Sequence, residues 1–266
     1  MLSKNKLKYI HSLEQKKYRL QEGVFVAEGV KCVGDLLREG YKARLIVCTE
    51  EWKKDNGIVS NAENFVHNGT EYCTVTSEDL RKCSFLQHPQ HVLAVFPLPT
   101  SAEFPNAEWV KENLCLALDG VQDPGNMGTI IRIADWFGIK NILCSKDTVD
   151  AYSPKTVQAT MGSIARVSIT YGDLDTYFAS LSNDIPIYGT LLDGKNLYET
   201  ELSNGGIIVM GNEGKGISPI IRSHVSHRLF IPPYPIDSST AESLNVAVAT
   251  AVTIAEFRRR STVVQP

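Results

Sequence analysis

The sequence of 266 residues predicts an α/β fold arranged in two domains. Three observations support this. Short apolar runs alternate with segments of helical periodicity, a proline-rich segment interrupts that pattern near residue 100, and 43 % of the residues are hydrophobic. In the second domain the apolar runs are continuous and separated by helices, which is typical of a mostly parallel sheet covered on both faces.

The first domain, residues 1–97, is expected to be a small α/β domain. Its helices are marked by amphipathic spacing, and its strands are short apolar runs. Gly40 suits a helix C-cap, and Thr76 or Ser77 suits an N-cap. In order, we expect a helix Asn5–Lys17, a strand Val24–Ala27, a helix Lys31–Glu39, a strand Leu45–Cys48, a helix Thr76–Lys82 and a strand His91–Phe96.

Residues 98–112 are predicted to link the two domains, since Pro97, Pro99 and Pro105 fall within one short stretch and break any periodicity. The second domain is then 113–266. Its strands are expected at Leu114–Leu118, Asn141–Cys144, Pro186–Leu192, Gly206–Met210 and His227–Ile231. Its helices are expected at Met127–Trp136, Thr156–Ile164, Leu174–Ser182, Pro219–His224 and Ala241–Arg260.

Several classes of protein are disfavoured by the composition. No run of eighteen apolar residues is present, which disfavours a membrane-spanning helix. The N-terminal segment is too polar for a signal peptide, so we expect a cytoplasmic protein. None of the six cysteines forms a CxxC pair, which argues against a metal site. Cys115 and Cys144 lie in apolar runs and are expected to be buried free thiols.

Charge is distributed unevenly between the two domains. Residues 99–266 hold 13 basic and 18 acidic residues, whereas the first 19 residues hold six basic residues and one acidic residue. A basic segment on an acidic protein suits a polyanion such as nucleic acid. A solvated amphipathic helix explains the same lysines equally well.

A first candidate motif, Asp123-Pro-Gly-Asn-Met-Gly128, follows a strand and opens a helix that carries Arg132 further along. Free N–H groups at a helix start favour an anion such as a phosphate, and a guanidinium binds phosphate in bidentate fashion. Taken alone, the motif is also explained if Asn126 caps the helix and Arg132 pairs with Asp135 or another acid.

A second motif, Gly211-Asn-Glu-Gly-Lys-Gly216, follows another strand. It lacks the spacing of a Walker A loop and that of a dinucleotide-binding loop. Three glycines let the backbone approach a ligand closely, although a tight turn would need them as well. A third motif joins Ile231-Pro-Pro, which offers backbone carbonyls, to Ser243-Leu-Asn245, where Ser243 or Asn245 can cap the last helix.

Together, DPGNMGTIIRIADWFG, MGNEGKG and IPP…SLNVAVATA resemble the three motifs of the SpoU (TrmH-like) branch of the SPOUT methyltransferases, over roughly residues 113–260. Residues 1–97 are similar, more loosely, to the L30e-like RNA-binding domain often fused ahead of it. The resemblance implies a C-terminal α/β-knot, which is a deep trefoil knot. It also implies a homodimer with the active site near the subunit interface, S-adenosyl-L-methionine as cofactor, and methylation of a ribose 2′-hydroxyl in RNA.

The resemblance also assigns roles to individual residues. The catalytic set is Asn126, Arg132, Glu213, Ser243 and Asn245. Arg132 would bind a phosphate beside the reacting hydroxyl, Asn126 would orient Arg132 or the ribose, and Glu213 would hold one of those two side chains. The cofactor would contact Thr190, Leu191, Gly211, Asn212, Gly216, Ile231 and Leu244. The spacing from Ile231 to Ser243 is longer than the family's usual pattern, because residues 237–242 form an insertion.

The resemblance favours ribosomal RNA over tRNA as substrate, because the two-domain arrangement is similar to that of rRNA-modifying members. We expect no membrane or metal partner. Two alternatives stay open at this point: a non-catalytic RNA-binding or ribosome-assembly factor with the same fold, and an unrelated doubly wound nucleotide enzyme.

Overall fold

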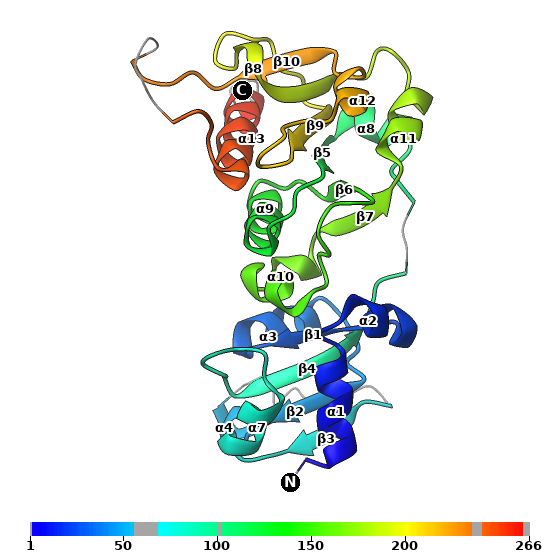
Figure 1. Ribbon diagram of the computed structural model, residues 1–266, viewed down its shortest axis with the longest axis vertical. Coiled ribbons are helices and arrows are strands. Elements are labelled where there is room, and N and C mark those ends of the chain that lie inside the picture. The colour runs from blue at the N-terminus through cyan, green and yellow to red at the C-terminus, as the bar shows by residue number, and fades with distance from the viewer. Residues whose placement is uncertain (1, 56–68, 101–102, 236–240, 263–266) are drawn as a thin grey trace. The chain divides into compact units, whose positions relative to one another are not determined.

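The computed structural model describes residues 2–55, 69–100, 103–235 and 241–262 (Figure 1). The chain divides into two compact units. Unit 1 comprises residues 1–100 and 150–166, and unit 2 comprises residues 101–149 and 167–266. None of the described helices is both long enough and apolar enough to cross a bilayer.

Unit 1 is built on a four-stranded sheet in the order β1-β4-β2-β3. Its strands are β1 (Val24–Glu28), β2 (Leu45–Cys48), β3 (Glu71–Thr74) and β4 (Val92–Pro97). β4 pairs antiparallel with β1 and β2, and β2 pairs parallel with β3. The helices are α1 (Lys4–Ser12), α2 (Lys16–Glu22), α3 (Val30–Arg38), α4 (Glu50–Asp55), α7 (Ser77–Cys83), α10 (Pro154–Ala159) and the short 3₁₀ turn η1 (Ser163–Ala165).

Unit 2 is built on a six-stranded sheet in the order β10-β8-β9-β5-β6-β7, in which every pairing is parallel. Its strands are β5 (Leu114–Asp119), β6 (Asn141–Ser145), β7 (Ser168–Gly172), β8 (Ile187–Asn196), β9 (Gly206–Gly211) and β10 (His227–Phe230). The helices are α8 (Ala107–Glu112), α9 (Pro124–Trp136), α11 (Leu174–Ser180), α12 (Pro219–Arg222) and α13 (Val246–Thr262). The predicted α/β class is confirmed.

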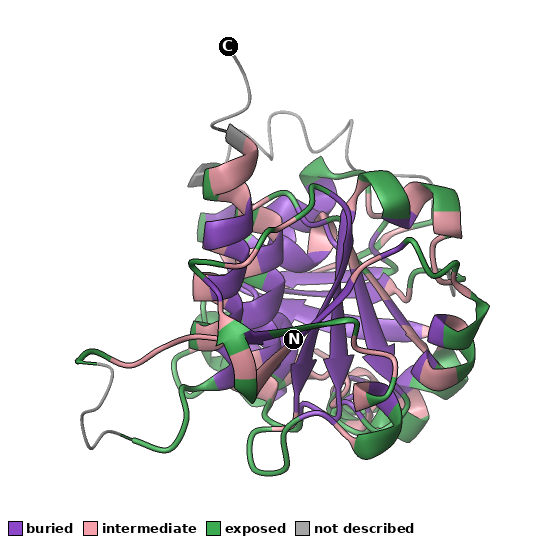
Figure 2. Cartoon of the chain, turned by 90° about the horizontal axis from the view of Figure 1, so that it is seen from above, coloured by how far each residue is buried: buried purple, intermediate pink, exposed green. Residues whose placement is uncertain are grey.

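Helices cover both faces of the second sheet. Successive strand residues point to opposite faces. Cys115 and Ala117 of β5 pack in one core cluster with Val110 of α8, Phe178 of α11 and Ile221 of α12. On the other face, α13 packs against α9 and β9, and Figure 1 shows α9 and α13 on the same side of the strands. The strands β5, β6 and β9 lie in the buried interior, whereas the helices turn exposed faces outward (Figure 2).

The predicted N-terminal helix is wrong as a single element, because α1 ends at Ser12 and α2 begins at Lys16. Arg19 is buried, and its Nη1 donates to the carbonyls of Leu13 and Glu14 at 2.7 and 2.6 Å. In a continuous helix those carbonyls would accept from the backbone four residues on. The same guanidinium is ion-paired with Asp150, so a partner distant in sequence stabilises the break.

Three further boundaries differ from those predicted. The last helix begins at Val246 rather than Ala241, because Asn245 caps it. The helix predicted over 156–164 is divided at Gly162, where an added Cβ would lie 2.3 Å from Oδ2 of Asp35. The linker region contains the helix α8, capped by the side chain of Asn106. The strands β3 and β7 and the helix α4 were not predicted.

Candidate active site at the carboxyl ends of β5 and β9

The site begins where β5 and β9, which are neighbours in the sheet, end side by side. Asp119, the last residue of β5, is buried, and its Oδ2 accepts a hydrogen bond from the backbone of Ser218 at 2.6 Å. Gly120 follows with positive φ, and its N–H donates to Ser145 Oγ and Thr148 Oγ1. Ligands of open parallel sheets bind at such carboxyl ends, where the strand order reverses.

The first motif forms the start of helix α9. Asp123 is the N-cap, since its Oδ1 accepts from the backbone of Asn126 at 2.8 Å, and Pro124 occupies the first turn. The alternative in which Asn126 caps this helix is therefore wrong. The Asn126 side chain is instead available for longer-range contacts, and its Nδ2 donates to Glu213 Oε1 at 3.0 Å. An Asp at the N-cap followed by proline was a readable signal in the sequence.

Glu213 joins the glycine loop to the α9 loop. Besides Asn126, its carboxylate accepts from the backbone N–H groups of Gln122 at 3.2 Å and Asp123 at 3.3 Å. Partial burial acts to raise the pKa of Glu213, but these hydrogen bonds outweigh it, so that the pKa lies below its ordinary value. Glu213 is thus a fixed anion that orients Asn126 and not Arg132. Sequence reasoning did not identify Gln122 and Asp123 as its partners.

The glycine loop itself is a tight, internally bonded turn. Asn212 and Gly216 exchange backbone hydrogen bonds at 3.0 and 2.9 Å. The Asn212 side chain donates to the carbonyl of Gly120 and accepts from the backbone of Gly214 and Lys215. A Cβ on Gly211 would lie 2.2 Å from the carbonyl carbon of Gly216, so only glycine fits there. The geometry of the turn therefore explains part of the need for Gly211, Asn212 and Gly216, even without a ligand.

The third motif meets the first two through Asn245. Its Oδ1 accepts from the backbone of Ala247 and Val248 at the start of α13, and its Nδ2 donates to Asn126 Oδ1 at 2.9 Å. One polar chain therefore runs from the α13 N-terminus through Asn245 and Asn126 to Glu213. Three segments far apart in the sequence converge here, and we call these three side chains the Asn–Asn–Glu chain.

Two predicted catalytic residues lie outside that chain. Arg132 and Ser243 are exposed, and neither has a hydrogen bond or ion pair within the described parts of the structure. Arg132 lies six residues beyond Asn126 on α9, about 1.7 turns further along. The pairing of Arg132 with Asp135 is absent. Its guanidinium is accessible for an external anion.

Four of the seven predicted cofactor residues lie on β8 or β9 or directly after β10. Thr190 and Leu191 lie in β8, Gly211 ends β9, and Ile231 directly follows β10. These strands are adjacent and parallel, so their carboxyl ends share one edge of the sheet. Leu244, before α13, leaves half of its surface exposed. The insertion at 237–242 lies largely outside the described residues.

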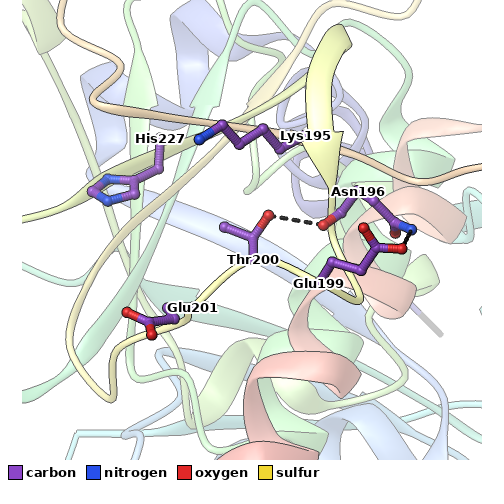
Figure 3. A pocket seen from close by; sticks show the side chains of 6 residues that line it. All are labelled: Lys195, Asn196, Glu199, Thr200, Glu201 and His227. Atoms are coloured by element: carbon purple, nitrogen blue, oxygen red, sulfur yellow. Dashed lines mark hydrogen bonds between the residues drawn. The ribbon is translucent and has the colours of Figure 1, made fainter.

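A hollow of about 540 Å³ lies elsewhere, on the second half of β8 and the segment that follows (Figure 3). It is lined by Lys195, Asn196, Glu199, Thr200, Glu201 and His227, none of which was predicted as a site residue. In the described parts of the chain, no group of three or more His, Cys, Asp or Glu side chains could hold a metal ion. Cys115 and Cys144 are buried free thiols, as predicted, and burial raises the pKa of Cys115 to about 12.

Two family models match successive parts of the chain. Residues 113–255 match the model described as the SpoU rRNA Methylase family, and residues 4–94 match that of the MRM3-like substrate binding domain. The 23S rRNA (guanosine(2553)-2′-O)-methyltransferase RlmP of Bacillus subtilis (strain 168) is 28 % identical over 95 % of this chain and 96 % of its own length.

Two solved structures are similar over nearly the whole chain. A candidate RNA methyltransferase of the TrmH family from Porphyromonas gingivalis has a TM-score of 0.84 and 41 % identity, covering 98 % of this chain and 99 % of its own. An rRNA methyltransferase from Sinorhizobium meliloti with bound AdoMet has a TM-score of 0.83 and 29 % identity, covering 98 % of this chain and 96 % of its own.

Proposed function

This chain belongs to the SpoU rRNA methylase family, and from that membership we propose that it methylates a ribose 2′-hydroxyl of ribosomal RNA with S-adenosylmethionine as methyl donor. The observation that carries the proposal is the Asn–Asn–Glu chain, in which one residue from each of three motifs is held in a fixed arrangement. A non-catalytic relative would have no need to keep all three.

The edge formed by β8, β9 and β10 suits the cofactor. Gly211 and Ile231 bring backbone groups there, and Leu191 and Leu244 bring apolar side chains. Such neutral, partly apolar surroundings fit a nucleoside. Backbone carbonyls at Ile231-Pro232-Pro233 are acceptors for an adenine amino group. When bound, S-adenosylmethionine supplies a methyl group on a sulfonium, which needs no metal to be transferred.

The residues around that edge position the ribose. Arg132, exposed and without a protein partner in the described structure, binds a phosphate adjoining the reacting nucleotide. A guanidinium offers hydrogen-bond donors and no acceptor, so the role of Arg132 is to orient the nucleotide rather than to accept the hydroxyl proton. Asn126, held in one orientation by Glu213 and Asn245, orients the ribose. Ser243 completes the set beside the cofactor residue Leu244.

The first domain is proposed to bind the RNA. Residues 4–94 match a substrate-binding domain, and the basic first helices suit a polyanion. The proposed functional domains are residues 1–97 for RNA binding and 113–266 for methyl transfer, with residues 98–112 as the linker. The relatives above that have an assigned substrate are ribosomal RNA enzymes, which favours rRNA over tRNA.

Homodimerisation and a deep trefoil knot are part of the same proposal. Trp136 on α9 leaves 85 % of its surface exposed, and Val248 on α13 is half exposed, so the paired helices offer apolar surface to a second copy. Support for the knot comes from the match of residues 113–255 to the SpoU family. Arg260 of α13 also donates to the carbonyls of Leu197, Tyr198 and Thr200, which lie between β8 and β9. Six unpaired cysteines suit the proposed cytoplasmic location.

Transfer of labelled methyl from S-adenosylmethionine to purified, unmodified rRNA and tRNA tests the substrate class. We expect label in rRNA and none in tRNA. Label in tRNA alone would move the substrate to tRNA. A folded protein that binds rRNA without transferring methyl would be an assembly factor.

A further inference from the structure

Strand β8 is irregular where it carries two of the predicted cofactor residues. Gly189 pairs with Arg228 of β10, but the next residue of β10, Leu229, pairs with Lys195. Residues 190–194 of β8 therefore have no pairing partners on β10. A bulge of this kind bends the strand and re-aims its side chains. We refer to residues 190–194 as the β8 bulge.

Two arginines converge on the carboxylate of Asp193 within the β8 bulge. Arg222 of α12 donates through Nη2 at 2.5 Å, and Arg228 of β10 donates through Nη1 at 3.0 Å, both to Oδ2. The side chain of Asp193 is 48 % exposed. The arginines come from separate elements, so Asp193 ties the bulge to both α12 and β10.

The rest of the β8 bulge is also fixed. An added Cβ on Gly194 would lie 2.5 Å from the carbonyl carbon of Leu229, so this end rests directly on the β10 backbone. At the other end Thr190 Oγ1 reaches the Val209 carbonyl of β9 at 3.4 Å. Leu191 packs against the buried core of unit 2. The bulge is therefore held between β9 and β10, and it carries Thr190 and Leu191, two of the residues proposed to contact the cofactor.

We propose that Asp193, with Arg222 and Arg228, is a positioning cluster that holds the β8 bulge in the conformation which binds S-adenosylmethionine. The inference rests on the proposed function. Half-exposed ion pairs contribute little to global stability, so the effect of this cluster is local. A bulge ordered before binding does not have to be ordered by the ligand, which strengthens binding without altering the methyl-transfer step.

The test is calorimetric titration of S-adenosylmethionine into the full-length protein, combined with steady-state kinetics on rRNA. For Asp193→Ala we expect the Kd and the KM for S-adenosylmethionine to rise roughly 3- to 10-fold, as for the loss of two exposed ion pairs. The kcat at saturating cofactor should change less than about twofold, because the Asn–Asn–Glu chain is untouched. Asp193→Glu, which keeps a carboxylate, should recover most of the affinity.

Asp184→Ala is the matched control, because Asp184 is 52 % exposed and ion-paired with Lys111, and among the described residues no hydrogen bond or ion pair joins it to a predicted cofactor residue. It should leave the Kd unchanged. High salt should weaken binding to the wild type but not to Asp193→Ala. Equal Kd values for the wild type and Asp193→Ala would overturn the positioning role while leaving the function standing. A wild type that binds no S-adenosylmethionine would overturn the proposed function and this inference with it.

Discussion

Glu213 accepts hydrogen bonds from three donors that belong to the first motif or adjoin it. Asn126 uses both ends of its amide, one toward Glu213 and one toward Asn245. A side chain held at both ends keeps one rotamer, which a reaction limited by geometry requires. In the proposed function, Glu213 therefore acts by fixing Asn126 and need not itself touch the substrate.

Replacing Glu213 with Gln should lower kcat on the order of 10²-fold. The amide presents only one acceptor oxygen to three donors, so Asn126 loses its fixed orientation. The measurement is steady-state methyl transfer at saturating S-adenosylmethionine and RNA. Glu199→Gln is a matched control, since Asn196 Nδ2 donates to Glu199 at 2.8 Å in a similar pair outside the predicted site. Equal rates in the two variants would refute the role of Glu213.

Arg132→Ala should also reduce kcat by roughly 10²-fold, while the melting temperature stays within about 2 °C. Arg132 is exposed and makes no polar contact in the described structure, so its removal costs the fold little. Arg132→Lys should be intermediate, because an ammonium keeps the charge but loses bidentate geometry. Full activity in Arg132→Ala would exclude a part in orienting the nucleotide.

At the scale of elements, the glycine loop is defined by close backbone packing. Gly211→Ala should destabilise the protein by about 1–3 kcal/mol and weaken cofactor binding, because the new Cβ collides with the backbone of Gly216 and Ile217. Gly214→Ala is the control, since its nearest neighbour would be Asn212 Oδ1 at 3.8 Å. Urea denaturation of both variants checks this. A Gly211→Ala protein as stable as the wild type would contradict the packing described.

Helix α13 ends in a charged cluster whose effect depends on pH. Hydrogen bonds from Arg259, opposed by burial and reinforced by Arg260, lower the pKa of Glu256 from 4.5 to about 2. The folded-state pKa lies below the unfolded one, so this stabilisation is complete above about pH 4.5. It is lost as the pH falls towards 2. The melting temperature of the wild type should therefore fall more steeply over that range than that of Glu256→Gln. Parallel curves would contradict this.

Elements that consist of buried apolar runs were predicted nearly to the residue. β5 and β9 are buried throughout, and the apolar runs at 114–118 and 206–210 are too short to be helices. β3 and β7 lie at sheet edges and are only partly buried, so their mixed polarity hid them. The break between α1 and α2 depends on Arg19 pairing with Asp150, a contact that local sequence does not reveal.

In the molecule as a whole, the two compact units are not two consecutive stretches of the chain. Residues 150–166 lie between β6 and β7 in sequence but belong to unit 1. Within that unit, Tyr152 packs on Phe25 with ring centroids 5.2 Å apart, and Arg166 pairs with Asp35. Nothing in the local periodicity of 150–166 distinguishes it from the other helices of the second domain.

The candidate site was only partly predictable from the sequence. Asn126, Glu213 and Asn245 are each weak signals, because caps and turns use the same residues. Their order along the chain made the combination specific, and the structure joins them by hydrogen bonds. The alternate roles of Glu213 were left open by the sequence, since only the fold decides that it reaches Asn126 and the α9 loop.

The proposed activity of this chain is methylation of the 2′-hydroxyl of a ribose in rRNA. Its most direct test is to label unmodified rRNA with S-adenosylmethionine carrying a radioactive methyl group, digest the product completely to nucleosides and separate them. We predict that the label elutes as a single 2′-O-methylnucleoside and disappears with Asn126→Ala. Label found on a base would contradict ribose methylation, and transfer that survives the loss of Asn126 would contradict the role of Asn126 in it.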